Sequence, residues 1–123
     1  MSSPPWPPTL HESATPGGLT VRPHHRRDAD AVLALGNDPQ TRRWTTLPDP
    51  YTREDAEEFL ARRIREVHPG GNLSLAIDLD GSYAGTIDLR CGPPGAAAVW
   101  YALAPWARGH GLTERALRLL LPW

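Results

Sequence analysis

The chain has 123 residues, of which 40% are hydrophobic and 22% are charged, a composition typical of one globular domain rather than a multidomain protein. Thirteen Lys and Arg residues face fourteen Asp and Glu residues, and the formal net charge of -1 argues against general attraction to nucleic acid or anionic membranes. All thirteen cations are Arg, which excludes Schiff-base lysine chemistry and a P-loop lysine.

The single cysteine, Cys91, excludes an intramolecular disulfide and forms no zinc-binding spacing with the five histidines. We therefore expect no metal. The first residues lack the basic segment and apolar run of a signal peptide, and no stretch approaches the roughly 18 apolar residues of a membrane span. We expect a cytoplasmic protein that binds neither nucleic acid nor a membrane.

Residues 1–18 are expected to form a disordered tail, because proline and glycine oppose both helix and ladder formation. The residues concerned are Pro4, Pro5, Pro7, Pro8, Pro16, Gly17 and Gly18. A Pro-rich ligand for a partner domain is the alternative, although no clean Pro-x-x-Pro context with a flanking Arg is present. The domain itself is predicted over residues 19–123.

The first half of this domain reads as one strand and two helices. The alternating residues 19–22 predict a strand, and a helix is expected from about 28 to 35. The run Gly36-Asn37-Asp38-Pro39 is expected to end that helix and to begin a loop. For the next helix, Thr52 can cap the amide of Asp55, and its apolar residues recur at helical spacing: Ala56, Phe59, Leu60, Ile64 and Val67.

The second half switches to a period of two. Alternation over residues 73–79 predicts a half-buried strand, Asp80-Gly81 predicts a hairpin turn, and residues 83–89 supply the returning strand. A third strand is expected at about 97–103, and the helix after it carries an apolar side made of Leu112, Ala116, Leu119, Leu120 and Trp123. The order β-α-α-β-β-β-α predicts an α/β (α+β) fold, with a mixed, mostly antiparallel sheet and flanking helices.

The segment with most chemical information is the start of the last helix. Amides of a first helical turn have no intrahelical acceptors, and the helix dipole adds positive charge, so a phosphate is a natural ligand there. Gly109 and Gly111 let the backbone approach an anion, and Arg108 adds a cation. A glycine-bearing turn with no ligand is the alternative. The chain lacks the Gly-x-Gly-x-x-Gly of dinucleotide folds and the Gly-Lys-Ser/Thr of P-loops.

Arg108-x-x-Gly111-x-Thr113 resembles the Arg/Gln-x-x-Gly-x-Gly/Ala motif of the GNAT N-acetyltransferase superfamily. The residues around it, 103–112, are similar to the ribosomal-protein N-terminal (alanine) acetyltransferase type. Residues 19–23, 50–56 and 85–90 add to the resemblance, which covers about residues 19–123.

The resemblance implies acetyl-coenzyme A (acetyl-CoA) as co-substrate and direct transfer of the acetyl group to an amine, on a protein N-terminus or a small molecule. The implied coenzyme-binding residues are Leu103, Ala104, Arg108, Gly109, His110, Gly111, Leu112 and Thr113. Of these, the segment from Arg108 to Thr113 would hold the pyrophosphate through backbone amides. A strand amide near Leu103 or Ala104 would polarise the thioester oxygen.

The sequence departs from the family's pattern in two ways. Thr113 stands where the family has Gly or Ala, but it can still offer its amide. The chain also stops at Trp123, where the family's fold continues with a strand, a helix and a hairpin, so we expect a C-terminally truncated domain that could be covered by a second copy or a partner at its open sheet edge.

The catalytic acid and base are unknown from the sequence. Asp88 and Tyr101 are the nearest candidates for these two catalytic groups, and a structural role is the alternative for each. Trp44 could line an acceptor pocket or pack on the sheet edge. Two functions follow: an N-acetyltransferase, or an inactive remnant that binds CoA or a protein partner. A third hypothesis is that the chain is a structural fragment, and this hypothesis predicts no ligand.

Overall fold

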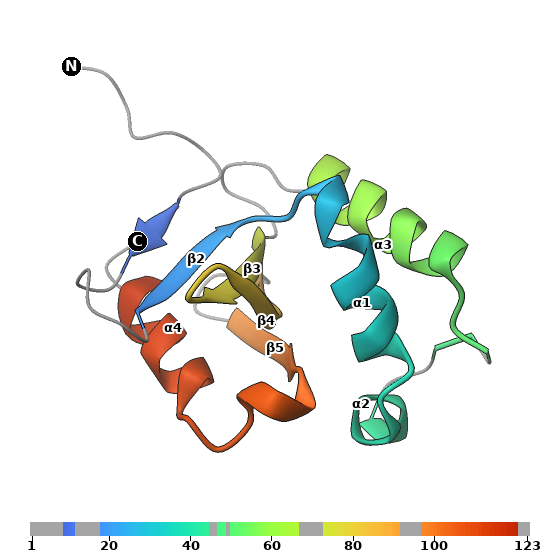
Figure 1. The fold of residues 1–123 in the computed structure, drawn as a ribbon. Coiled ribbons are helices and arrows are strands. Elements are labelled where there is room, and N and C mark those ends of the chain that lie inside the picture. The colour runs from blue at the N-terminus through green and yellow to red at the C-terminus, as the bar shows by residue number, and fades with distance from the viewer. Residues whose placement is uncertain are drawn as a thin grey trace.

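A computed structural model of the chain describes residues 9–11, 18–44, 47–48, 50–66, 73–91 and 97–120. A single sheet runs through the middle of the fold, with α4 on one side and α1 and α3 on the other (Figure 1). The elements are β1 (Leu10–His11), β2 (Leu19–Pro23), η1 (Arg26–Asp28), α1 (Ala29–Gly36), α2 (Pro39–Trp44), α3 (Arg53–Glu66), β3 (Leu73–Leu79), β4 (Ser82–Cys91), β5 (Ala97–Leu103), η2 (Pro105–Ala107) and α4 (Leu112–Leu120). Within these described ranges, no helix combines the length and the apolar character needed to span a bilayer.

The strands lie in the order β1-β2-β3-β4-β5, and every neighbouring pair is antiparallel. This confirms the predicted mostly antiparallel sheet and its four main strands, although β4 runs from Ser82 to Cys91 and is longer than predicted. At the β3–β4 turn, Asp80 has φ 52° and Gly81 has φ 84°, as a tight two-residue hairpin turn requires. The turn signal in the sequence is therefore confirmed.

The two-residue strand β1 corrects the prediction that residues 1–18 form no ladder. Leu10 lies opposite Val21, and His11 lies opposite Thr20 with 3.0 Å between the His11 Nδ1 and Thr20 Oγ1 atoms. Thr9, Leu10 and His11 contain no proline, so their backbone can pair with the otherwise open edge of β2. The prolines of this segment lie outside the described residues.

The helix α3 confirms the strongest helix signal in the sequence. The Thr52 amide donates to Asp55 Oδ2 at 2.8 Å, and the Asp55 amide donates to Thr52 Oγ1 at 3.3 Å, which together form a capping box. Ala56 and Leu60 are buried against α1, whereas Ile64 is 46% exposed, so the buried stripe of α3 ends before Ile64.

The helix α2 corrects the predicted loop after α1. Asp38 Oδ2 accepts hydrogen bonds from the Thr41 amide at 2.9 Å and from Thr41 Oγ1 at 3.0 Å. Asp38 therefore acts as the N-cap, and Pro39 occupies the first helical position, where a proline is favourable. The same Asp-Pro pair that ends α1 begins a second helix.

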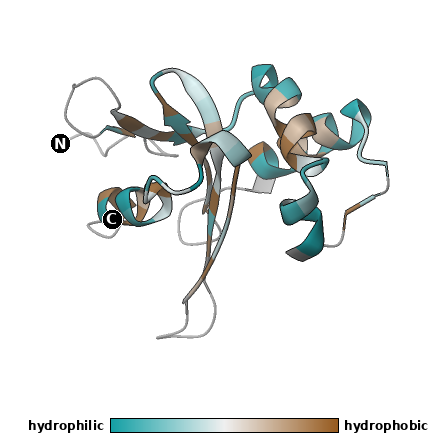
Figure 2. Ribbon diagram, turned by 60° about the horizontal axis from the view of Figure 1, so that its bottom comes forward, coloured by the Kyte–Doolittle hydropathy of each residue, from teal (hydrophilic) through white to brown (hydrophobic). Residues whose placement is uncertain are grey.

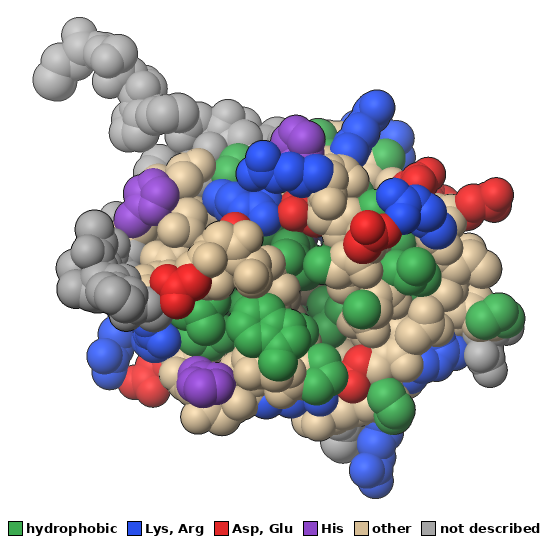
Figure 3. Space-filling view, viewed as in Figure 1, with side chains coloured by type: hydrophobic (Ala, Val, Ile, Leu, Met, Phe, Trp, Pro, Cys, Tyr) green, Lys and Arg blue, Asp and Glu red, His purple; other side chains and the backbone are tan. Residues whose placement is uncertain are grey.

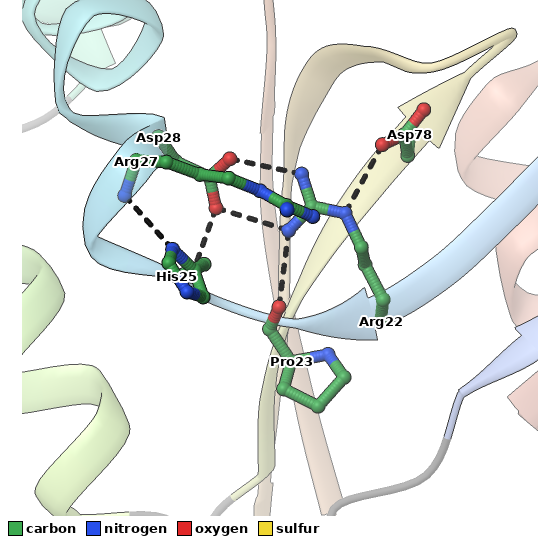
Figure 4. Close-up of polar contacts among 6 residues, drawn as sticks. All are labelled: Arg22, Pro23, His25, Arg27, Asp28 and Asp78. Carbon is green, nitrogen blue, oxygen red and sulfur yellow. Dashed lines mark hydrogen bonds and ion pairs between the residues drawn. The ribbon is translucent and has the colours of Figure 1, made fainter.

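The connection from β2 to α1 is held by Arg22 (Figure 4). Its guanidinium donates to both carboxylate oxygens of Asp28, at 2.9 and 3.0 Å, and to Asp78 Oδ2 at 3.0 Å. Burial alone would raise the pKa of Asp28, but the hydrogen bonds from Arg22 and from the His25 amide outweigh it, so the pKa is lowered. Arg22, which pairs with the ionised Asp28 and with Asp78, thus joins β2, β3 and the start of α1.

The helix α4 packs its apolar side on the sheet. Leu112, Ala116 and Leu120 are buried in one cluster with Val21 and Ile77, which confirms that side as predicted; Trp123 lies outside the described residues. Figure 2 shows the same division, with hydrophilic residues gathered on the outer turns of the helices and hydrophobic residues along the strands. The packing brings the start of α4 beside the end of β5.

Candidate functional site

A pocket of about 680 Å³ lies between β5, α2 and the start of α4. Its walls come from three segments, of which α2 lies far from the other two in the sequence. The lining residues are Gln40, Thr41, Val99, Trp100, Tyr101, Ala102, Leu103, Arg108, Gly109, Gly111, Leu112, Thr113 and Glu114. The structure therefore brings most of the predicted site residues together in one place.

The loop before α4 turns its glycines toward open space. Gly109 has φ 83° and Gly111 has φ 65°, a region that residues with side chains rarely adopt. A Cβ atom built on either glycine meets nothing within 4 Å. The backbone of this loop is thus accessible to a bulky ligand in the pocket.

The first turn of α4 offers unused hydrogen-bond donors. Its first intrahelical bond runs from the Arg115 amide to Gly111 O at 3.0 Å, so the amides of Leu112, Thr113 and Glu114 precede the helical ladder. The Thr113 Oγ1 atom is buried and has no hydrogen-bond partner among the described residues. Together with the helix dipole, these donors favour an anion at this end of the pocket.

Arg108 is engaged differently from the prediction. Its Nη2 atom forms an ion pair with Asp38 Oδ2 and lies 3.4 Å from Thr41 Oγ1. The hydrogen bond from Arg108 lowers the pKa of the Asp38 carboxyl, which stays ionised at neutral pH. The charge of Arg108 is thus already balanced by a carboxylate, and its guanidinium points toward α2.

On β5, the two candidate strand amides differ. The Ala104 amide donates to Ala84 O at 2.8 Å and is satisfied within the sheet. Because an antiparallel ladder alternates its hydrogen-bonding direction along each strand, the amide of the adjacent Leu103 turns to the other edge of β5. Leu103 therefore keeps the predicted geometry for polarising an oxygen in the pocket, and the Ala104 amide does not.

The two acid–base candidates, Tyr101 and Asp88, differ in their position relative to the pocket. Tyr101 lines the pocket and is 53% exposed. Asp88 is not among the lining residues and is 2% exposed on the sheet face covered by α3. The suggestion of Asp88 as a catalytic group therefore lacks the required geometry, because its side chain points away from the pocket.

Asp88 instead belongs to a buried polar cluster. Ser74 Oγ donates to Asp88 Oδ1 at 2.6 Å, and Arg63 Nη2 lies 3.5 Å from Asp88 Oδ2. His24 Nε2 lies 3.0 Å from Ser74 Oγ; since the serine hydroxyl donates to Asp88, the histidine donates to the serine. Burial lowers the pKa of His24 to about 4, so its ring is neutral at pH 7. This cluster ties α3 to the sheet.

Of the other predicted residues, Ala104 and His110 do not line the pocket. His110 is exposed. Trp44 ends α2, but its side chain is outside what the structure describes. Nor does any group of three or more His, Cys, Asp or Glu residues within the described ranges gather as metal ligands would.

The sequence reasoning missed the α2 wall of the pocket. Gln40 and Thr41 line it, and so does Glu114 from the first turn of α4. The signal for Gln40 and Thr41 was present in Asp38-Pro39, an N-cap residue followed by a proline at the first helical position. Glu114 could have been placed by counting from the same helix start that located Thr113.

The surface shown in Figure 3 has no area dominated by one sign of charge. Hydrophobic side chains gather near its middle, and acidic and basic side chains alternate around them. The distribution agrees with a formal net charge of -1.

Several solved structures share this fold. Mycobacterium smegmatis RimJ in complex with CoA-disulfide is 23% identical, with a TM-score of 0.76 over 98% of this chain and 63% of that chain. The microcin C7 self-immunity acetyltransferase MccE, in complex with acetyl-CoA and AMP, is 17% identical, with a TM-score of 0.74 over 85% of this chain and 61% of that one. RimL, a ribosomal L7/L12 alpha-N-protein acetyltransferase in complex with coenzyme A, is 21% identical, with a TM-score of 0.72 over 93% and 66%.

These structures extend beyond the present chain, which spans 61% to 66% of the length of the first four that match. A comparison with curated proteins gave no match. The family model described as "Acetyltransferase (GNAT) domain" matches residues 18–123, which is nearly the whole chain. The fold, the loop before α4 and this match together show that the chain belongs to the GNAT acetyltransferase family.

Proposed function

We propose that this chain binds acetyl-CoA in the pocket beside β5 and transfers the acetyl group to an amine, on a protein N-terminus or a small molecule. The observation that carries the proposal is the junction of three features in one pocket. These are two accessible positive-φ glycines, the unused amides at the start of α4, and the open edge of β5. The membership of the GNAT family supports the same activity.

The residues present fit the anionic part of acetyl-CoA. A pyrophosphate needs several donors within a short arc, and the loop from Gly109 to Thr113 offers backbone amides there, whereas the Arg108 amide already donates to Pro105 O at 3.3 Å. The bare glycine backbone leaves space for the phosphate oxygens. The buried Thr113 hydroxyl would gain a partner from such a ligand. The threonine in place of Gly or Ala is therefore compatible with the site.

The β5 edge provides the groups for acetyl transfer. Acetyl-CoA supplies an activated thioester, and its pantetheine arm would run along this edge. The Leu103 amide would donate to an oxygen there and stabilise developing negative charge. Tyr101 is the hydroxyl on the same strand and the candidate donor of a proton. Holding both reactants in one pocket would contribute by proximity.

One observation favours a second candidate function. Within the described sheet, β5 pairs only with β4 and leaves its other edge open beside the pocket. The alternative is therefore a module that binds CoA, or a protein partner, without catalysis and is completed by another polypeptide at this edge. The two functions differ in turnover and share the binding pocket.

Calorimetry with CoA on the purified chain tests the binding common to both enzymatic and CoA-binding functions. Binding near one molecule per chain is expected. Acetyl-CoA is then incubated with a panel of amines, including peptides with free N-termini, and thiol release is followed. Release that depends on the amine supports the transferase. Binding without release supports the module, and no binding contradicts acetyl transfer.

A pair of substitutions at Gly111 separates the effect of charge from that of backbone strain. Gly111→Asp places a carboxylate beside the predicted pyrophosphate, and Gly111→Asn places a neutral group of the same shape in the same positive-φ position. Gly111→Asp is expected to abolish CoA binding, while Gly111→Asn retains measurable binding. Equal affinities of the two variants would contradict the placement of the pyrophosphate.

A further inference from the structure

The ion pair between Asp38 and Arg108 joins two parts of the molecule that are 70 residues apart in the sequence. Asp38 caps α2, and Arg108 begins the loop that leads to α4. The same Asp38 oxygen, Oδ2, accepts from Arg108 Nη2, from the Thr41 amide and from Thr41 Oγ1. One carboxylate thus holds both the helix start and the loop.

The pair is sheltered from solvent. The Asp38 side chain is 8% exposed, and the Arg108 side chain is 27% exposed. By contrast, the ion pair between Arg53 and Asp30 joins side chains that are 57% and 83% exposed. Sheltered pairs resist screening by salt, and removal of one partner leaves the other charge partly buried and uncompensated.

The position of the pair bears on the pocket. Thr41 lines one wall, and Gly109 and Gly111 line another, so the Asp38–Arg108 contact bridges these walls at one end. The glycines have no side chains with which to anchor the loop, whereas Arg108 has one and uses it on Asp38. Among the described contacts, the side chain that anchors the start of this loop, that of Arg108, is therefore held by the residue that caps α2 and by Thr41.

We propose that Asp38 is a positioning residue for the coenzyme-binding loop, which it holds in place through Arg108. The inference rests on the proposed function. It assigns to Arg108 the role of an anchor, in place of the direct phosphate cation expected from the sequence. Through this anchor, α2 and the loop before α4 act as one unit around the phosphates.

The two roles of Arg108 predict opposite effects of Asp38→Asn. If Asp38 only neutralises a phosphate-binding cation, its loss frees Arg108, and CoA binds as tightly as before or more tightly. If Asp38 positions the loop, its loss weakens CoA binding by about tenfold. Calorimetry with CoA on the wild type and Asp38→Asn distinguishes these outcomes, and unchanged or tighter binding overturns the proposal.

Three controls separate positioning from general damage to the fold. Asp38→Glu keeps the carboxylate and is expected to restore most of the affinity. Asp30→Asn removes the exposed pair with Arg53 and is expected to leave affinity unchanged. Pantetheine, which lacks the phosphates, is expected to bind the wild type and Asp38→Asn equally. Equal losses for CoA and pantetheine would indicate general damage and contradict the proposal.

A second measurement does not need a ligand. Hydrogen exchange of the free protein is expected to be faster at the amides of Gly109 to Thr113 in Asp38→Asn, and unchanged in β3 and β4. If the wild type fails to bind CoA, the proposed function fails, and this exchange still decides whether Asp38 holds the loop. Unchanged exchange in the loop overturns the positioning role.

Discussion

At the scale of single residues, His24 in the buried polar cluster makes the stability of the folded protein depend on pH. Burial lowers its pKa, with smaller lowering contributions from the positive charges of Arg22 and Arg63, while Asp28 raises it. The folded protein therefore binds the His24 proton less tightly than the unfolded chain does. Stability is fully present above the unfolded pKa of 6.5 and is lost as the pH falls toward the folded value of about 4.

Unfolding in urea at pH 7 and pH 5 checks this dependence. The difference between the two pKa values predicts a loss of about 2 kcal/mol in the free energy of unfolding between these pH values. His24→Gln keeps a donor toward Ser74 and does not titrate, so its free energy of unfolding is expected to fall much less between pH 7 and pH 5. The depressed pKa values of Asp28 and Asp38 act at lower pH. An equally steep dependence in His24→Gln would contradict the assignment.

Gly85 is required by the close approach of β4 and β5. A Cβ at this position would lie 2.2 Å from Ala102 O and 3.0 Å from Leu103 Cα, both of which are backbone atoms. Gly85→Ala is therefore expected to destabilise the fold by about 2 kcal/mol or more and to displace the Leu103 amide. Chemical denaturation measures the first effect, and calorimetry with CoA measures the second.

Gly81→Asn in the same hairpin is the matched control for Gly85→Ala. Gly81 has φ +84° and nothing within 4 Å of a built Cβ, and asparagine tolerates this backbone region. Its cost is expected to stay below about 1 kcal/mol. If both substitutions cost the same, the close contact between the strands is not what Gly85 provides.

At the scale of elements, the capping box at the start of α3 is the most clearly readable feature. Thr52→Ala removes the side-chain acceptor for the Asp55 amide and is expected to lower the free energy of unfolding by about 1 kcal/mol. Thr52→Ser keeps the oxygen and is expected to cost much less. Urea denaturation of both variants measures the difference, and equal costs would show that the cap contributes nothing.

The elements differ in how well their sequences predict them. The β3–β4 hairpin and α3 were predictable, because turn and cap residues act within four positions of one another. The helix α2 was missed because Asp38-Pro39 is compatible both with ending α1 and with starting another helix. The strand β1 was missed because two residues carry no period, and their pairing with β2 is a tertiary contact.

At the scale of the whole molecule, β5 leaves one side of the described sheet unpaired, beside the apolar side chain of Val99. Open edges with apolar side chains favour association through strand pairing. We expect self-association that increases with protein concentration, and Val99→Lys is expected to reduce it. Sedimentation velocity over a concentration series measures the change.

Ile64→Lys is the control for this surface. Ile64 is 46% exposed on α3, and Val99 is 45% exposed on β5, so the two substitutions add the same charge at equal exposure. Ile64→Lys is expected to leave association unchanged. If both variants reduce association equally, net charge accounts for the effect rather than the β5 edge.

The sequence by itself determined the order of the main strands and helices and the segment that forms the candidate site. It could do so because caps, turns and hydrophobic periods depend on neighbouring residues. The two glycines at a helix start were found in this way, and the resemblance to the GNAT motif from Arg108 to Thr113 pointed to the same segment, which leads into α4 in the structure.

Only the tertiary structure decided which side chains meet in that site. Asp38 and Arg108 are 70 residues apart, and nothing in the local pattern of either predicts the contact. Asp88 and Tyr101 were equal candidates until the strand register turned Tyr101 to the pocket and Asp88 to the face beneath α3. The physical reason is that strand pairing and helix packing, which are non-local, set the direction of each side chain.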